Sequence, residues 1–325
     1  MTETLADSEA ARLLDAARSG ERGALARLLT MVERGGAEAH AVARVAAAGA
    51  APGAGYTVGI TGAPGAGKST LTNALVRRMR RDGIELAVLA VDPSSPFTGG
   101  AILGDRVRMS DHALDDGVFI RSMATRGHLG GLGLATPGAV RLLHAAGRPW
   151  VLIETVGVGQ VEVEVAGAAD TTVVVVNPGW GDAVQANKAG LLEIADVFVV
   201  NKADRPGADD TRRDLDAMLE LTEGRDWRPP IVGTVAVDGD GVDELWSAIG
   251  DHRSYLEASG ELERRREQRR REELAHIVTE RLRARADELC GGDAFEAVQA
   301  RIRRGELDPW SAADELLGVE SDPHR

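Results

Sequence analysis

The residues with the clearest chemical meaning lie between Thr57 and Thr70. A short apolar run is followed there by Gly62-Ala63-Pro64-Gly65-Ala66-Gly67-Lys68-Ser69-Thr70. This segment fits G-x-x-x-x-G-K-[ST], the phosphate-binding loop between a strand and a helix. Because glycine has no Cβ, successive backbone N–H groups can turn inward and cradle phosphate oxygens at the positive end of the helix. Lys68 can then reach the β- and γ-phosphates, and the Ser69 hydroxyl can bind Mg²⁺.

The composition bears on this motif in two ways. The chain has 39 glycines, so a chance match is the alternative, but apolar residues follow at helical spacing, as the motif requires. Of the 38 basic residues, only Lys68, Lys188 and Lys202 are lysine. A compact ammonium fits among phosphates where a planar guanidinium is too large. We therefore treat Lys188 and Lys202 as functional candidates too, with an inconsequential surface lysine as the alternative for Lys188.

Two aspartates follow the second apolar run. Asp92 comes directly after residues 86–91, and a carboxylate at the end of a parallel strand suits Mg²⁺ directly or through water. Asp105 lies beyond a glycine-rich segment and could contact the metal or the attacking water. Each also has a structural interpretation, because Asp92 could cap the following turn and Asp105 could be a helix N-cap.

A third carboxylate closes the apolar run 150–153. Glu154 stands where a Walker B carboxylate holds Mg²⁺, although aspartate is commoner there. The N–H of Gly157 could sense the γ-phosphate, and the neighbouring glycines allow the loop to reorganise after hydrolysis. We interpret residues 154–162, which include Gln160, as a candidate switch. We assign catalytic roles to Lys68, Asp105 and Glu154.

Asn201-Lys202-Ala203-Asp204 follows the run 197–200 and indicates which base is bound. In N-K-x-D the aspartate accepts the N1–H and the exocyclic N2–H₂ of guanine. Adenine offers neither donor, so Asp204 would be left unpaired at a cost of about 1–3 kcal/mol or more. Asn201 and the stem of Lys202 brace the base and the phosphate loop. Thr234-Val235-Ala236 would add a backbone contact to the base, and the nucleotide-binding set includes Val235, Ala236 and Val237.

These segments need a scaffold, and the sequence from 56 to 237 predicts one. Strand-like apolar runs alternate there with helical stretches, which is typical of an α/β fold with a doubly wound, mostly parallel sheet. Ligands in such sheets bind beyond the carboxyl ends of the strands, where these motifs stand. The runs are Tyr56–Ile60, Leu86–Val91, Val118–Ile120, Trp150–Ile153, Thr172–Val176, Val197–Val200 and Ile231–Val235.

Helical sequence flanks this region on both sides. Residues 7–50 carry apolar side chains at three- and four-residue spacing and predict two or three short helices packed on the main domain. Residues 252–290 predict a long charged helix whose single apolar stripe a partner subunit would cover, with a solvated helix as the alternative. Residues 293–318 add one or two short helices, the last beginning at Asp308-Pro309. We therefore divide the chain into an N-terminal helical extension (1–52), a nucleotide-binding domain (53–250) and a C-terminal helical arm (251–325).

Bulk properties exclude several classes of protein. The net charge of −13 argues against nucleic acid or an anionic membrane as a partner. The single cysteine, Cys290, excludes an intramolecular disulfide and a cysteine metal cluster within one chain. No secretory signal is visible at the acidic N-terminus, and the apolar runs are too short to span a membrane. We expect a soluble, cytoplasmic protein.

Taken together, the motifs resemble those of one family. The order GAPGAGKST, VDPSSPFTGGAILGDRVRM, RGHLGGL, ETVGVGQVEVEVA, PGWGDAVQANKAG and NKAD is similar to that of the MeaB/ArgK family, in the SIMIBI class of phosphate-loop GTPases. These are G-protein chaperones of adenosylcobalamin-dependent acyl-CoA mutases. The resemblance covers nearly the whole chain. It implies a GTPase that gates cofactor loading and protects such a mutase, methylmalonyl-CoA mutase or a close relative. It also implies a homodimer held by the C-terminal helical arm.

The resemblance also implies roles for particular residues, with GTP and GDP as ligands. It implies Mg²⁺ coordination by four of them: Ser69, Asp92, Asp105 and Glu154. It implies that residues 178–190 form an additional switch that reports nucleotide state to the mutase. The polar members of that switch are Asp182, Gln185 and Lys188. Trp180 and Ala183-Val184 depart from the family pattern in this segment and bear on the partner more than on the GTPase chemistry.

Other functions remain open at this point. A nickel-type metal-insertion GTPase needs soft or imidazole ligands, but the seven histidines form no short-spaced cluster. A kinase acting on a small substrate would use ATP, against which Asp204 argues. A scaffold that binds nucleotide without hydrolysing it is a further alternative. Arg106, Arg108 and Arg126 are candidates for an arginine finger, none of them assigned, so we expect slow intrinsic turnover that a partner accelerates.

Overall fold

All seven apolar runs form strands in the computed structural model, which describes residues 5–49, 53, 55–92, 112, 114–124, 135–155, 167–179, 190, 193–221 and 226–318. The strands are β1 (Tyr56–Gly62), β2 (Leu86–Asp92), β3 (Val118–Ala124), β4 (Trp150–Thr155), β5 (Thr171–Val176), β6 (Val197–Asn201) and β7 (Ile231–Thr234). They lie in the order β3-β2-β4-β1-β5-β6-β7, and every neighbouring pair is parallel. The predicted α/β fold with a doubly wound sheet is confirmed, and the described sheet is parallel throughout.

The chain divides into two compact units, Met1–Arg269 and Arg270–Arg325. The first contains the sheet, the phosphate-loop motif and the N-K-x-D motif. The division into three parts at residues 52 and 250 stays a prediction.

Burial on both faces explains why the central strands read as uninterrupted apolar runs. Strands β1, β4, β5 and β6 are buried at every position, as expected for a parallel sheet covered on both sides. The edge strand β3 continues four residues past its predicted end, into a more polar sequence. In this part of β3, Arg121 forms an ion pair with Glu33 of the N-terminal helices, with Nη2 2.6 Å from Oε2.

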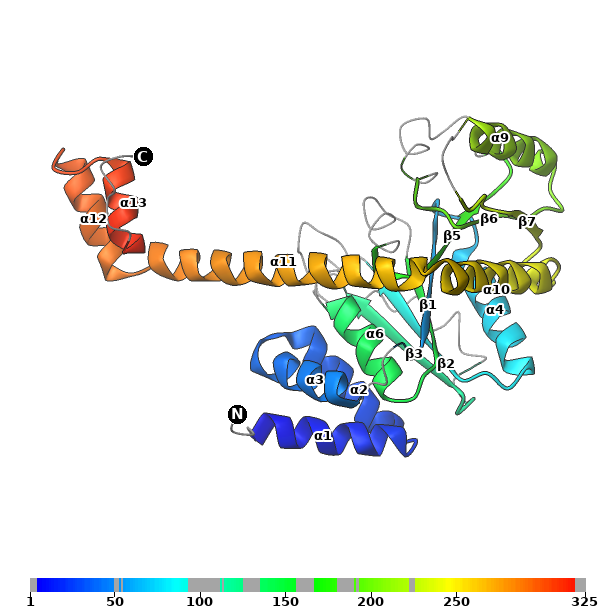
Figure 1. Cartoon of the computed structure of the whole chain (residues 1–325), viewed down its shortest axis with the longest axis horizontal. Coiled ribbons are helices and arrows are strands. Elements are labelled where there is room, and N and C mark those ends of the chain that lie inside the picture. Colours follow the sequence, from blue (N-terminus) through cyan, green and yellow to red (C-terminus); the bar gives the residue numbers. More distant parts are fainter. Residues whose placement is uncertain are drawn as a thin grey trace. The chain divides into compact units, whose positions relative to one another are not determined.

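Helices cover the two faces of the sheet (Figure 1). The apolar side chains between helices and sheet form separate clusters on the two faces. On one face, α4 (Lys68–Arg81) and α10 (Val242–Ser259) pack against alternate residues of the strands. On the other face, α6 (Ala135–Ala145) packs against β2 to β4, while α9 (Ala208–Glu220) packs against β5 and β6. Because all neighbouring strands are parallel, the carboxyl ends of all seven strands lie at one edge of the sheet. Helix α4 begins at that edge.

Three N-terminal helices complete the face covered by α6. They are α1 (Leu5–Arg18), α2 (Arg22–Arg34) and α3 (Gly36–Gly49). The sequence predicts two or three helices in this region, and the structure has three. Their buried leucines and alanines belong to the same apolar cluster as α6 and strands β2 to β4. Arg18 also donates to the carbonyl of Ala145 at 2.8 Å. These helices are thus a continuous part of the core of the first unit.

Gly260 divides what the sequence predicts as one helix over residues 252–290. Helix α10 ends there, and α11 (Glu261–Cys290) begins at the next residue. Gly260 has φ +72°, and its N–H donates to the carbonyl of Glu257 at 3.4 Å. Glycine adopts this left-handed conformation without strain, and the conformation stops a helix. The expected continuous helix is therefore wrong at this position.

The first turns of α11 are fixed to the sheet by two buried aspartates. Asp170 directly precedes β5, accepts the N–H of Thr57 in β1 at 3.0 Å, and forms an ion pair with Arg266 at 2.7 Å. Arg269 contacts the same carboxylate. Asp196 repeats the arrangement before β6, because it accepts the N–H of Thr172 at 2.8 Å and pairs with Arg265 at 3.0 Å.

The electrostatics of these aspartates favour the charged form. Burial raises the pKa of the Asp170 carboxyl, but Arg266 and Arg269 outweigh burial and hold that pKa below its usual range. Burial likewise raises the pKa of Asp196, and the contacts with His252 and Arg265 hold it below its usual range. Both aspartates lie at the amino-terminal edge of the sheet, opposite the edge with the nucleotide motifs.

The second unit contains the rest of α11 with α12 (Asp293–Arg303) and α13 (Pro309–Leu317). Asp308 caps α13 by accepting the N–H groups of Trp310 and Ser311, as Asp308-Pro309 predicts. Arg301 and Glu315 join α12 to α13 through an ion pair of 2.7 Å. Among the described residues, no helix is both long enough and apolar enough to cross a membrane.

Candidate nucleotide-binding site

The predicted phosphate loop lies between β1 and α4, at the middle of the sheet. At two positions of this loop there is no room for a Cβ atom, so only glycine can occupy them. Gly62 has φ +133°, and a Cβ there would lie 2.0 Å from the carbonyl oxygen of Val175. Gly67, the N-cap of α4, has φ +92°, and its Cβ would lie 2.4 Å from Nδ2 of Asn201. Only glycine fits either position.

The loop's own carbonyls hold Lys68 in place. Its side chain is buried, and Nζ donates to the carbonyls of Gly62 at 2.6 Å and Ala63 at 3.1 Å. Ser69 follows in the first turn of α4, whose N–H groups have no acceptors within the helix. These N–H groups, the positive end of the helix and the ammonium make the loop suited to bind phosphate.

Strand β6 brings the N-K-x-D motif into contact with this loop. Asn201 is buried, and its Nδ2 donates to the carbonyl of Ala66 at 2.8 Å. Lys202 donates from Nζ to the carbonyl of Gly65 at 2.7 Å. It has φ +60° and is the one non-glycine residue with positive φ in the part of the chain that the structure describes. The backbone therefore turns sharply at Lys202, and the side chain of Asp204 lies exposed in the turn that follows.

The segment after β7 lies beside that motif. The Asn201 Oδ1 accepts hydrogen bonds from the Thr234 hydroxyl at 3.0 Å and from the N–H of Ala236 at 3.2 Å. The N–H of Ala203 donates to the carbonyl of Thr234 at 3.0 Å. Val237 is 73% exposed. The structure thus brings together residues 62–70, 201–204 and 235–237, which the sequence predicts as a nucleotide site.

Carboxylates close two neighbouring strands on the other side of the loop. Glu154 lies near the end of β4, is buried, and is in register with Ile60 of β1 and Ala90 of β2. Asp92 is the last residue of β2. Of the predicted Mg²⁺ ligands, Ser69 and Glu154 carry hard oxygen donors, which is the ligand chemistry that Mg²⁺ prefers, and the role of Asp92 stays a prediction.

Several predicted site residues lie outside the described residues. They are Asp105, Gly157, Gln160, Asp182, Gln185 and Lys188. The arginine-finger candidates Arg106, Arg108 and Arg126, and the departures Trp180 and Ala183-Val184, lie outside them too. Their assigned roles stay predictions.

Two polar contacts near the site are absent from the sequence-based prediction. The Thr234 side chain supports Asn201, whereas the sequence indicated only its backbone. The Thr155 hydroxyl donates to that of Thr61 at 3.3 Å, next to Glu154 and the phosphate loop. The sequence could have indicated these contacts through the threonines near the ends of β1, β4 and β7. Threonine is common in strands, however, so this signal is weak.

The strand order, the phosphate loop after the central strand and the N-K-x-D motif after β6 define a phosphate-loop GTPase-like fold. The crystal structure titled "LAO/AO transport system kinase" has this fold, with a TM-score of 0.69, 29% identity, and coverage of 96% of this chain and 97% of that one. A protein of Pyrococcus abyssi described as a GTPase is 48% identical over 309 residues, covering 94% of this chain and 95% of its own length. The mouse methylmalonic aciduria type A homolog is 34% identical over 275 residues, covering 83% of this chain and 66% of its own length.

The family model described as "Methylmalonyl Co-A mutase-associated GTPase MeaB" matches residues 25–289. The chain therefore belongs to the MeaB family of GTPases, and the resemblance inferred from its motifs is confirmed.

Proposed function

We propose that this protein binds GTP and hydrolyses it to GDP and phosphate. The observation that carries the proposal is the direct attachment of the N-K-x-D segment to the phosphate loop through Asn201 and Lys202. This arrangement would place Asp204 beside the base of a nucleotide whose phosphates are bound by residues 62–70. Guanine offers Asp204 two N–H donors, so the site selects GTP over ATP.

The roles of the residues follow from their positions. The N–H groups of residues 62–70 and the Lys68 ammonium would stabilise negative charge on the phosphates as water attacks in line. Ser69, Asp92, Asp105 and Glu154 would hold Mg²⁺, directly or through water. When bound, Mg²⁺ supplies positive charge that offsets the charge on the β- and γ-phosphates.

The sharpest test changes the base preference. We expect Asp204→Asn to weaken GDP binding by tenfold or more and to improve binding of xanthosine diphosphate, because an amide donates where the carboxylate only accepts. Calorimetry with GDP, ADP and xanthosine diphosphate on both proteins measures this. Tighter ADP than GDP binding by the wild type, with phosphate transfer from ATP to a small substrate, would support the kinase alternative and overturn the proposal.

We further propose that the GTPase acts as a chaperone for an adenosylcobalamin-dependent acyl-CoA mutase, gating its cofactor loading and protecting it by coupling to GTP hydrolysis. The name of the family supports a mutase partner, and the predicted switches at 154–162 and 178–190 would report nucleotide state to it. Capture of such a mutase from native extract, dependent on a non-hydrolysable GTP analogue, tests the partner. An increase in GTP turnover on adding that mutase tests the coupling, and no change would contradict it.

We also propose a homodimer formed through α11. Leu274, Val278 and Leu282 are 63%, 47% and 63% exposed within one chain, and they stand at four-residue spacing on one side of a helix. A second copy of the same stripe would cover these side chains.

A further inference from the structure

A buried side chain on α4 has a polar atom without a hydrogen bond. Asn73 is 9% exposed, and its Oδ1 is shielded from solvent and has no hydrogen-bond partner among the described residues. The neighbouring Thr72 shows the usual arrangement, because its buried hydroxyl donates to the carbonyl of Lys68 at 3.0 Å. A buried acceptor without a donor destabilises the folded chain. A donor that becomes available in a bound state would offset this cost.

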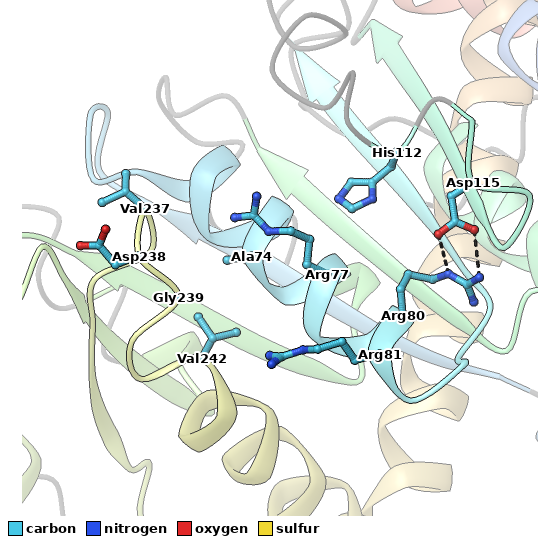
Figure 2. A pocket seen from close by; sticks show the side chains of 10 residues that line it. All are labelled: Ala74, Arg77, Arg80, Arg81, His112, Asp115, Val237, Asp238, Gly239 and Val242. Carbon is cyan, nitrogen blue, oxygen red and sulfur yellow. Dashed lines mark hydrogen bonds and ion pairs between the residues drawn. The ribbon is translucent and has the colours of Figure 1, made fainter.

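The pocket on the outer side of α4 does not supply this donor. Figure 2 shows Arg77, Arg81 and His112 around that pocket, which has a volume of about 640 Å³. Ala74 also lines it, but Asn73 does not. Because solvent does not reach the Asn73 oxygen, water in the pocket cannot hydrogen-bond to it. The donor must therefore come from another side of the helix.

The geometry of the helix directs Asn73 toward Ser69. The two residues are four apart in α4 and therefore share one face of it. Helical side chains tilt toward the N-terminus of their helix, so the Asn73 amide covers the turn that contains Ser69. Ser69 is a predicted Mg²⁺ ligand. The acceptor without a partner thus stands one helical turn behind a hydroxyl that would bind a metal.

The other described ligand candidate lies on the same side of the sheet. Leu152 of β4 belongs to the apolar cluster that contains the buried residues of α4, whereas Ile153 belongs to a cluster on the opposite face. Because side chains alternate along a strand, Glu154 faces α4 as Leu152 does. Ser69 and Glu154 therefore bring hard oxygen donors to one side of the sheet, which fits Mg²⁺.

A hydroxyl that binds a metal through its oxygen still has a proton to donate. Groups that hydrogen-bond to a metal ligand orient it and strengthen metal binding. We propose that Asn73 is a positioning residue of the Mg²⁺ site, and that its Oδ1 accepts the hydroxyl proton of Ser69 when Ser69 binds Mg²⁺. This inference rests on the proposed GTPase function, because it requires Mg²⁺ to bind together with the nucleotide.

Calorimetric titration of GDP in EDTA and at a series of free Mg²⁺ concentrations measures how Mg²⁺ strengthens nucleotide binding. We expect Asn73→Leu to need at least about tenfold more Mg²⁺ for half of the full effect, with unchanged GDP affinity in EDTA. Asn73→Ala should show the same loss with a smaller side chain. Asn73→Asp keeps an accepting oxygen and adds negative charge, so it should bind Mg²⁺ at least as tightly as the wild type. The matched control Thr72→Val removes a buried hydroxyl from the same turn and should leave the Mg²⁺ dependence unchanged.

Thermal unfolding of the nucleotide-free protein separates a positioning role from a structural one. Asn73→Leu removes an acceptor that has no partner, so we expect its unfolding midpoint to equal or exceed that of the wild type. A structural role predicts a lower midpoint together with weaker GDP binding in EDTA, and that result would overturn the inference.

Two results of the Mg²⁺ titrations would also overturn it. One is a wild-type Mg²⁺ dependence in both Asn73→Leu and Asn73→Ala. The other is a loss in Asn73→Asp as large as that in Asn73→Leu, since a carboxylate accepts but does not donate. Both leave the proposed GTPase function intact. GDP binding by the wild type that did not respond to Mg²⁺ would instead overturn the Mg²⁺ site and the role of Asn73 together.

Discussion

The side-chain amide of Asn201 donates to the backbone carbonyl of Ala66 at 2.8 Å, across 135 residues of sequence. The same amide accepts from the Thr234 hydroxyl and the Ala236 N–H. One buried side chain therefore joins the phosphate loop, the end of β6 and the segment after β7. The parts of the site that would contact phosphate and base are positioned together rather than independently.

Replacing Asn201 by alanine should disturb both binding and stability. We expect Asn201→Ala to lose about 1–3 kcal/mol of unfolding free energy, because buried polar groups are left without their partners, and to weaken GDP binding by tenfold or more. Urea unfolding and calorimetry measure the two effects. Asn177→Ala, at a half-buried asparagine with one bond of 3.3 Å to Pro178, is the control. Equal effects of the two changes would argue against the joining role.

Two glycines of the phosphate loop allow a matched comparison. Gly65 and Gly67 both have positive φ, but a Cβ at Gly65 meets nothing within 4 Å, whereas at Gly67 it meets Asn201 at 2.4 Å. We expect Gly65→Ala to cost about 1–2 kcal/mol through backbone strain alone. Gly67→Ala should cost more and should abolish detectable GDP binding. Thermal unfolding and GDP titration test this, and equal costs would show that the contact with Asn201 is unimportant.

The pairing of Asp170 predicts how stability depends on pH. Its pKa is lower in the folded state than in the unfolded chain. Its contribution is therefore complete above the unfolded-state pKa of about 4 and is lost as the pH falls through the folded-state pKa. We expect Asp170→Asn to cost about 3 kcal/mol at neutral pH, since it breaks a buried ion pair.

The difference between Asp170→Asn and the wild type should shrink as the pH falls from 7 to 3. Urea unfolding at several pH values measures it. Asp210→Asn removes an aspartate whose ion pair with Arg213 is exposed, and it should change stability little at any pH. A gap that stayed constant down to pH 3 would contradict the assignment.

The apolar stripe of α11 predicts oligomeric state. We expect Leu274→Ser/Leu282→Ser to turn a dimer into a monomer, because each dimer would lose four buried leucine side chains. Light scattering coupled to size exclusion measures the mass. Leu317→Ser replaces a leucine on α13 that is 62% exposed and should leave the mass unchanged. A wild-type protein that is already monomeric would refute the dimer.

The sequence predicted the parts of this structure that depend on continuous or short-range signals. The seven strands were found because strands buried on both faces are apolar without interruption. The phosphate loop and the N-K-x-D motif were found because their residues are adjacent in the chain. The break at Gly260 was missed because one glycine between charged segments is a weak signal. The partners of Asp170 and Asp196 were missed because Arg266 and Arg265 lie 96 and 69 residues away.

The ion pairs of Asp170 and Asp196 also determine where the chain can be shortened. A fragment that ends at residue 250 would keep both buried carboxylates but would lose Arg265, Arg266 and Arg269. It would therefore carry two uncompensated charges beneath the starts of β1, β5 and β6. A fragment that ends after Arg269 retains every one of these partners and coincides with the end of the first compact unit. Studies of the nucleotide site without the arm should use the longer fragment.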